Sequence, residues 1–249
     1  MMRKYFITSL LPGILLSIVS LACQLSVNVP LVGARGSGNV VTEERQVGDF
    51  TRVELSGIGD LEIETGDRPA LRIEAEDNIL SLIETEVIGD TLRIGFRDNS
   101  IPRPTRSIRY FLTVVSLEAL DASGLGNITA PDLQAERFTI TISGGGDIEI
   151  SGLEAEAVEI DISGLGNLEI NGGEATNLEV DISGGGDLNS ENLRAQEASI
   201  NISGLGSATV RVSDLLRAEI SGGGSVRYYG NPDVEEEVSG LGKVERLGD

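Results

Sequence analysis

The chain contains no histidine and no tryptophan, and Cys23 is its only cysteine. Without histidine, a Ser-His-Asp or Cys-His catalytic group cannot form, and histidine-based zinc or iron sites are excluded as well. A single cysteine cannot form a disulfide within the chain. Aromatic residues make up 4% of the sequence, which disfavours a platform that stacks sugar rings. Paired carboxylates remain available, so a polysaccharide-active enzyme stays open as an alternative function.

Basic residues are also scarce. The chain has 19 lysines and arginines against 40 aspartates and glutamates, which gives a formal net charge of −21 at pH 7. The acids are spread over positions such as Glu149, Glu159, Glu169 and Glu179, which favours solubility. A surface of this charge repels the phosphates of nucleic acids and anionic lipid headgroups. The composition therefore predicts no nucleic-acid partner.

The N-terminus has the pattern of an export signal. Arg3 and Lys4 precede an apolar run, Phe6–Val19, and the segment closes on the tetrad Ser-Leu-Ala-Cys that ends at Cys23. An apolar run of this length is shorter than the roughly twenty residues that span a bilayer. The tetrad resembles a bacterial lipobox, so we expect residues 1–22 to be a signal peptide and Cys23 to carry a lipid. An uncleaved membrane anchor is the alternative. Either outcome places the protein outside the cytoplasm, attached to the bacterial cell membrane or outer surface.

The next segment, residues 23–39, combines the lipidated cysteine with a predicted flexible tether. It contains Pro30, Gly33, Gly36 and Gly38 and has no sustained apolar period, as in loops and linkers. No linker is evident afterwards. Residues 40–249 are therefore predicted to form a single domain, irregular over 40–120 and regular over 121–249.

A repeat dominates the second half of the chain. The motif Ser-Gly-x-Gly recurs every twenty residues and then every eighteen, with one earlier copy at Ser56; the repeats begin at Ser123, Ser143, Ser163, Ser183, Ser203, Ser221 and Ser239. A fixed period of this length is the signature of a solenoid, in which each coil buries its apolar face against its neighbours.

Rows of apolar residues define the coil. Apolar residues stand one and three positions before each serine with a polar residue between them, as in a strand with one buried face. The predicted inward rows are Leu120, Ile140, Ile160, Val180, Ile200 and Ala218; Ala122, Ile142, Ile162, Ile182, Ile202, Ile220 and Val238; and Ile128, Ile148, Leu168, Leu188, Ala208, Val226 and Val244. The sequence thus predicts an all-β fold, a parallel β-helix (β-solenoid) with coils of about 20 residues. At a strand spacing of about 4.8 Å, the roughly nine or ten coils expected would form a rod roughly 45 Å long.

The paired glycines of the motif are predicted to turn the chain at a corner, through flexible φ values or a close backbone approach. A phosphate-binding loop would need a helix after the glycines, whereas a strand is expected there. The residue between the glycines alternates between leucine and glycine, and the sequence leaves open whether the leucines are inside or exposed. This row is Leu125, Gly145, Leu165, Gly185, Leu205, Gly223 and Leu241.

A polar ladder follows the corner: Asn127, Asp147, Asn167, Asp187, Ser207, Ser225 and Lys243. Alternating Asp with Asn separates the carboxylates by two coils and puts an amide between them, so we interpret the row as support for the turn. Calcium bound by Asp147 and Asp187 is the alternative, which would make the chain a calcium-stabilised surface protein. Known calcium-binding β-rolls, however, repeat every nine residues. No cofactor is expected.

The segment before the regular repeats is similar to a known family. The resemblance rests on Gly48–Ile63, Leu71–Asn78, Ile83–Val87, Asp90–Ile94 and Leu117–Gly124, and it extends from about residue 45 to the C-terminus. In order and content these elements resemble the bacterial family called putative auto-transporter adhesin, head GIN domain. The resemblance implies a right-handed β-helix, secreted or held at the surface, often on a lipoprotein signal. It supplies no established catalytic or binding residues.

Two places where the period breaks are the candidate binding sites. Residues 97–107 contain Arg97, Arg103 and Arg106 and lie close to Arg109, which together form the only basic cluster after the signal. They are predicted to form either a simple projecting loop or a docking site for an acidic partner. Near the C-terminus, the adjacent Tyr228 and Tyr229 could bind a ligand or only pack against a coil.

Taken together, these features predict a non-catalytic, lipid-anchored envelope protein with a β-solenoid head. It would act in adhesion, binding or scaffolding, on an extracellular or envelope ligand that the sequence does not identify. Its membrane contact would be the lipid on Cys23. The alternatives are the polysaccharide-active β-helix enzyme and the calcium-stabilised surface protein.

Overall fold

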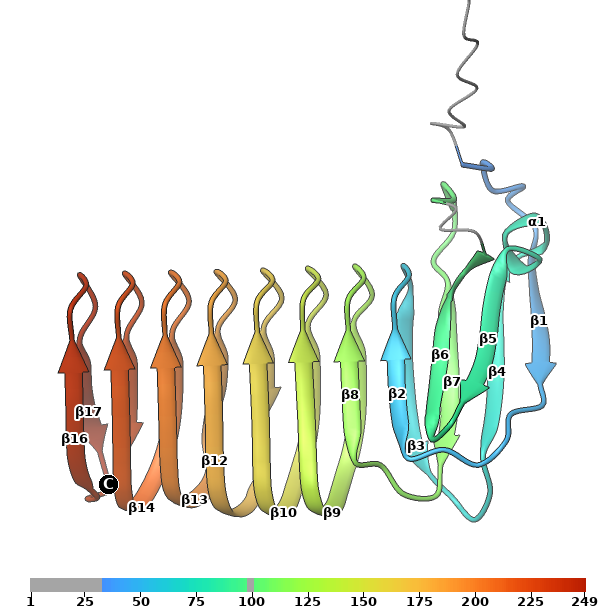
Figure 1. The fold of residues 1–249 in the computed structure, drawn as a ribbon. Coiled ribbons are helices and arrows are strands. Elements are labelled where there is room, and N and C mark those ends of the chain that lie inside the picture. The colour runs from blue at the N-terminus through green and yellow to red at the C-terminus, as the bar shows by residue number, and fades with distance from the viewer. Residues whose placement is uncertain (1–32, 98–100) are drawn as a thin grey trace, which may run out of the picture. The chain divides into compact units, whose positions relative to one another are not determined.

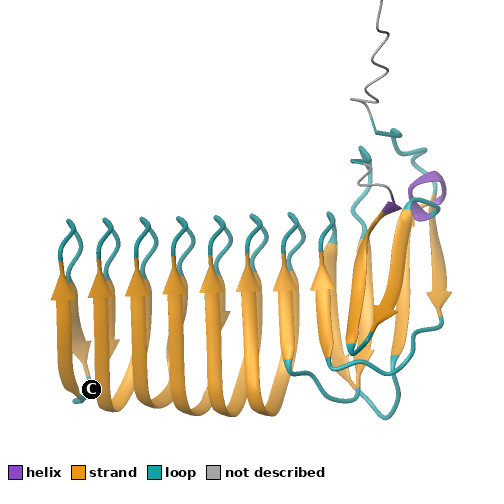
Figure 2. Cartoon of the chain, viewed as in Figure 1, coloured by secondary structure: helices purple, strands orange, loops and turns teal. Residues whose placement is uncertain are grey.

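The computed structural model describes residues 33–97 and 101–249. The signal peptide and Cys23 therefore lie outside the described residues. Residues Val32–Asp249 form one compact unit with its own buried core. Strands make up nearly all of its regular structure (Figures 1 and 2), and no helix among the described residues is long and apolar enough to cross a membrane.

The N-terminal part contains seven strands and one short helix. These are β1 (Val40–Arg45), β2 (Arg52–Leu55), β3 (Asp60–Thr65), β4 (Ala70–Glu76), α1 (Asp77–Leu80), β5 (Ile83–Ile88), β6 (Thr91–Phe96) and β7 (Arg109–Val114). The remaining strands build the regular coils: β8 (Ala119–Ala122), β9 (Ile128–Ile142), β10 (Ile148–Ile162), β11 (Leu168–Ile170), β12 (Gly173–Ile182), β13 (Leu188–Ile202), β14 (Ala208–Ile220), β15 (Val226–Tyr229), β16 (Asp233–Val238) and β17 (Val244–Gly248).

The regular coils confirm the predicted β-solenoid. Strands β9 and β10 pair in parallel with a register shift of twenty residues, so that Ile128 lies beside Ile148. Between β13 and β14 the register changes, and beyond it Ala208 lies beside Val226, eighteen residues away. The shorter spacing in the sequence is thus absorbed by irregular pairing after Ser190. About six turns result.

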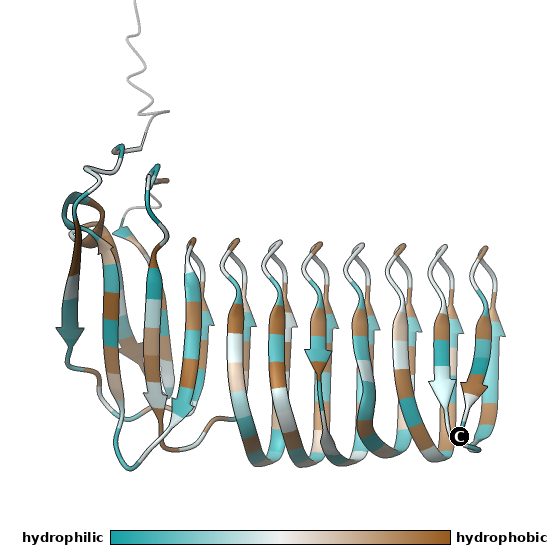
Figure 3. Cartoon of the chain, turned by 180° about the vertical axis from the view of Figure 1, so that it is seen from behind, coloured by the Kyte–Doolittle hydropathy of each residue, from teal (hydrophilic) through white to brown (hydrophobic). Residues whose placement is uncertain are grey.

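The predicted inward rows form the core. Their members are buried from Leu120 through Val226, and Figure 3 shows apolar and polar residues alternating along the strands. Full burial of one such side chain contributes about 1.5–3 kcal/mol relative to exposure. At the last coil the prediction is wrong for Val238, which is 41% exposed. Its strand, β16, is paired on one side only, with β14.

The N-terminal part is not built of regular coils, and the expectation of nine or ten coils is wrong. Strand β2 pairs in parallel with β8, and β3 with β9, so these two strands continue the solenoid. Strands β1 and β4, β4 and β7, and β5 and β6 instead pair antiparallel. These antiparallel pairs form a cap next to the coils formed by β2 and β3 (Figure 1).

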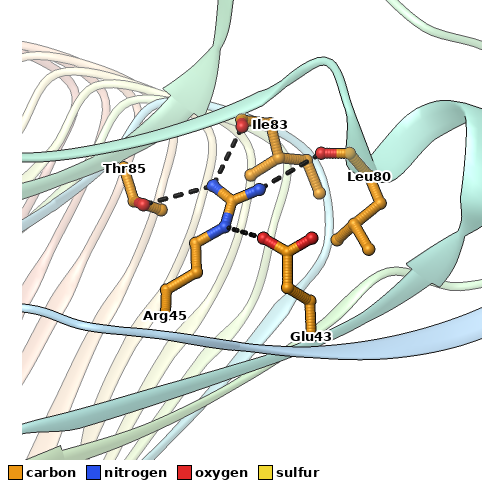
Figure 4. Close-up of polar contacts among 5 residues, drawn as sticks. All are labelled: Glu43, Arg45, Leu80, Ile83 and Thr85. Carbon is orange, nitrogen blue, oxygen red and sulfur yellow. Dashed lines mark hydrogen bonds and ion pairs between the residues drawn. The ribbon is translucent and has the colours of Figure 1, made fainter.

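Arg45 holds the edge strand of the cap, as Figure 4 shows. Its guanidinium donates hydrogen bonds to the carbonyls of Ile83 (2.9 Å) and Leu80 (3.2 Å) and to Oγ1 of Thr85 (3.1 Å). It also forms an ion pair with Glu43 at 2.7 Å. The bonds join β1 to the end of α1 and to β5, and the bond to Leu80 satisfies a carbonyl at the end of the short helix.

Glu76 joins three separate segments of the cap. Its carboxylate accepts hydrogen bonds from the backbone N–H of Gly38 (2.6 Å) and Thr105 (2.8 Å) and from the Thr105 hydroxyl. A side chain on Gly36 would lie 1.9 Å from Oε2 of Glu76. Residues 36–39 are thus hydrogen-bonded to the cap, although the sequence assigns them to the tether.

We expect Glu76→Gln to destabilise the cap. Burial raises the pKa of Glu76, but hydrogen bonds from Thr105, Gly38 and Arg106 outweigh it and hold the pKa below its ordinary value. A lowered pKa stabilises the folded state above the unfolded pKa, and this contribution disappears as the pH falls through the folded pKa. Melting curves should show a Tm several degrees below wild type at pH 7 and a smaller difference below about pH 4. A Tm difference that stays constant with pH would contradict this role.

Candidate functional site

The corner residues between the glycines form an exposed apolar line. The side chains of Leu125, Leu165, Leu205 and Leu241, which we call the corner stripe, are 70%, 76%, 79% and 96% exposed. For Leu125, Leu165 and Leu205 the glycine on the following coil leaves room: a Cβ on Gly145 would lie 3.2 Å from Cδ2 of Leu125. The alternation of leucine and glycine thus lets these three leucines lie along the surface over the next coil.

An apolar groove continues the corner stripe at the cap. It encloses about 670 Å³ and is lined by the corners of four neighbouring coils and by residues from two segments of the cap; its apolar members are Ile58, Phe96, Ile101, Pro102, Leu125 and Leu165. Ile101 is 77% exposed, whereas Pro102 is buried. The loop at 101–107 therefore contributes to this surface through its apolar residues.

The backbone groups of the corners form hydrogen bonds with the neighbouring coils. The N–H of Gly145 donates to the carbonyl of Gly124 at 3.0 Å, and the N–H of Leu165 donates to the carbonyl of Gly144 at 2.9 Å. Strands, not helices, follow the corners. The corner glycines from Gly124 to Gly242 allow this stacking because, without a Cβ, their backbones can approach the neighbouring coil closely. Their φ values stay outside the left-handed region. A phosphate-binding loop is incompatible with this geometry.

The polar ladder stacks as predicted. Oδ1 of Asn127 accepts from the N–H of Asp147 at 3.1 Å, and Oδ1 of Asp147 accepts from the N–H of Asn167 at 2.8 Å. The amide of Asn167 also donates to Asp147 at 3.0 Å, and Asp187 accepts from the N–H of Ser207 at 2.7 Å. Asp147 and Asp187, the calcium candidates, thus bind the backbone of the next coil. In the described part of the chain, no group of three or more potential metal ligands comes together.

The arginines of the predicted basic cluster have separate roles. Arg109 forms an ion pair with Glu74 at 2.7 Å. The backbone of Arg103 pairs with Ala34 and Gly36, and the N–H of Arg106 donates to Glu76 at 3.4 Å. The residues Arg97, Arg103 and Arg106 are exposed. Of the cluster, the side chains of Arg97, Arg103 and Arg106 therefore remain accessible to a partner.

The tyrosine pair packs against its own coil. Tyr228 is partly buried against the core and lies in register with Val210. The guanidinium of Arg211 lies 4.9 Å from the ring centre of Tyr229, in a cation–π contact. Both contacts agree with the interpretation that these residues pack the last coils, and neither brings Tyr228 or Tyr229 to the corner stripe.

One shallow groove, of about 530 Å³, is lined by acids. Four glutamates line it without any lysine or arginine: Glu136, Glu154, Glu156 and Glu174. Glu174 instead pairs with Arg194 on the next coil at 2.8 Å. Cleavage by a carboxylate together with an arginine would need both groups in one groove, and this groove lacks the arginine. A groove of about 550 Å³ at the cap does combine Glu62 and Glu64 with Arg68, so the enzyme remains an alternative.

Sequence reasoning missed Asp121, which it placed outward. Its Oδ1 is buried without a hydrogen-bond partner, and its Cα is in register with that of Glu54 on the neighbouring strand. Burial, and secondarily the charge of Glu54, raise the pKa of the Asp121 carboxyl. A raised pKa means that the folded state loses stability as the pH rises from the unfolded pKa through the folded one.

We therefore expect Asp121→Asn to stabilise the fold at pH 7. Removing a like-charge neighbour should raise Tm by about 1–3 °C. The gain should vanish under acidic conditions, where the wild-type carboxyl is itself protonated. Melting curves at pH 7 and pH 4 test this, and a lower Tm for the variant at pH 7 would show that the carboxylate is stabilising.

The sequence and the fold were compared with those of known proteins. A model of the family described as putative auto-transporter adhesin, head GIN domain, matches residues 49–232. A putative adhesin from Bacteroides fragilis has 22% identity and a TM-score of 0.81, and the alignment covers 86% of this chain and all of that one. A putative adhesin from Parabacteroides merdae has 24% identity and a TM-score of 0.73, with coverages of 86% and 98%.

A third solved structure, described as a putative lipid binding protein from Parabacteroides distasonis, has 23% identity and a TM-score of 0.64. Its alignment covers 86% of this chain and 98% of that one. The three structures confirm the fold. A search of curated proteins found no match.

Proposed function

Since the chain belongs to the family described as putative auto-transporter adhesin, head GIN domain, we propose that it is a non-catalytic binding protein of the bacterial cell envelope. Its role would be adhesion or scaffolding. The family description and the solved putative adhesins support a surface or extracytoplasmic place.

The observation that carries this proposal is the corner stripe. Four leucines that are at least 70% exposed lie in one row, on a chain with a net charge of −21. Exposed apolar patches of soluble proteins commonly mark interaction sites. Every second coil presents a leucine at this corner, so a partner would meet several equivalent contacts at once, which strengthens weak individual contacts.

Binding can be measured with residues 32–249 immobilised on beads and incubated with fluorescent envelope fragments and, separately, with a glycan array. We expect retention above that of beads coated with an equally acidic protein. Replacing the outward acids Asp161 and Asp181 by serine should preserve retention, because the corner stripe is unchanged. Retention no greater than that of the acidic control in both assays would contradict the proposed function.

The proposed attachment is a lipid on Cys23. The residues before it carry the charge, apolar run and tetrad of a lipoprotein signal. Cells expressing the full chain should incorporate labelled palmitate, and Cys23→Ser should abolish the label. Equal labelling of the two chains would show that the lipid is elsewhere, and no labelling of wild type would favour an uncleaved anchor.

A further inference from the structure

The corner stripe is straight and lies along one edge of the described unit. Its leucines occur on every second coil, so neighbours are about 10 Å apart and the four extend over about 29 Å. In Figure 1 the corner loops form a row along this edge, and the loop at 101–107 projects on the same side. The stripe and the apolar groove at the cap are thus parts of one continuous edge.

The corner residues themselves carry no charge, although the exposed Asp147 and Asp187 of the polar ladder directly follow two of the corners. Each leucine stands between two glycines and follows a serine and a glycine, so its nearest chain neighbours carry no charge. Ser123, Ser143, Gly144 and Gly145 line the groove beside the apolar residues. Leucines surrounded by hydroxyl and amide groups suit a boundary between hydrocarbon and water. The net charge of −21 opposes contact with an anionic lipid surface and favours a zwitterionic one.

The described chain begins at the same edge. A Cβ on Gly33 would lie 1.5 Å from the carbonyl oxygen of Ile101, a residue that lines the groove. Gly33 is ten positions after Cys23, and a chain of that length reaches at most about 35 Å. A lipid on Cys23 would therefore keep this edge close to the membrane surface. The exposed Arg103 and Arg106 are on the same loop as Ile101, where they could contact lipid phosphates.

We propose that the corner stripe rests on the zwitterionic lipid surface of the membrane to which Cys23 anchors the chain. This inference rests on the proposed lipid anchor and names the partner of the proposed binding surface. A line of single leucines fits a fluid interface, which requires no matching pocket. The solenoid then lies along the membrane, and the acidic strand faces remain available for scaffolding.

The test uses the full lipidated chain in phosphatidylcholine vesicles that contain brominated lipids. Cys23 is blocked when it carries its lipid, so one new cysteine can be labelled with a fluorophore. Ser183→Cys places the label at a corner, and Glu179→Cys places it on the strand face of the same coil; both positions are exposed. We expect the bromines to quench the corner label about threefold more strongly than the face label, because quenching requires contact with the acyl region.

A second pair of variants tests the leucines themselves. Leu165→Ser with Leu205→Ser, on the coils that flank Ser183, should reduce corner quenching to the level of the face label while the protein still floats with the vesicles. Equal quenching of the corner and face labels in the otherwise wild-type chain would overturn this inference and leave the anchor intact. Failure of that chain to float with the vesicles would overturn the anchor and the inference together.

Discussion

Gly164→Ala is expected to destabilise the solenoid by about 3 kcal/mol or more, within the upper range of overpacked sites. A Cβ at Gly164 would lie 2.0 Å from the carbonyl oxygen of Gly144. That oxygen belongs to the backbone of the preceding coil and accepts the N–H of Leu165. The coils would have to separate at this corner. Thermal unfolding followed by circular dichroism should show a Tm roughly 6–12 °C lower than wild type.

Gly185→Ala is the matched control. Its Cβ would lie 3.1 Å from Cδ2 of Leu165, the flexible end of an exposed side chain. The leucine can rotate away, so we expect a loss below about 1 kcal/mol. Equal Tm values for Gly164→Ala and Gly185→Ala would show that close backbone stacking does not set the requirement for glycine.

Ile162→Ala is the second substitution with a large expected effect. Ile162 is fully buried and stacks in register between Ile142 and Ile182 on the neighbouring coils. Truncation removes apolar contacts and leaves a cavity in the core of the coil, which should lower the free energy of unfolding by about 2–5 kcal/mol. Denaturant unfolding measures this loss. Because coils of a solenoid can unfold in steps, the transition should be followed with two probes.

Ile162→Val provides the graded comparison. It removes one methyl group and should cost about 0.5–1.5 kcal/mol. A loss for Ile162→Ala no larger than that for Ile162→Val would mean that the row at Ile162 is loosely packed.

The regular coils were predictable because their rows repeat at a fixed distance. The shorter spacing from Ser203 to Ser221 also indicates the change of register that is found between β13 and β14. The antiparallel cap was not predictable in the same way. Alternation reports which face of a strand is buried, but it does not report the direction of the neighbouring strand. Gly89, with φ of +65°, lies in the turn between β5 and β6 and was the available signal for that hairpin.

The candidate site was harder to predict from the sequence than the regular coils. A leucine between two glycines fits both an inward and an outward corner, so only the structure showed that the corner stripe is exposed. The bonds of Glu76 connect it with residues 29 to 38 positions away, which no local pattern indicates. Asp121 stands in a row of outward polar residues, and its burial follows from the neighbouring strand β2. The role of Cys23 lies outside the described residues and stays a prediction.

The central claim is that the corner stripe serves binding and not folding. The most direct measurement compares residues 32–249 with the variant Leu165→Ser, Leu205→Ser, for both Tm and retention of envelope fragments. Because both leucines are more than 70% exposed, we predict a Tm within about 2 °C of wild type and a loss of most of the retention. A marked fall in Tm with retention unchanged would contradict the account.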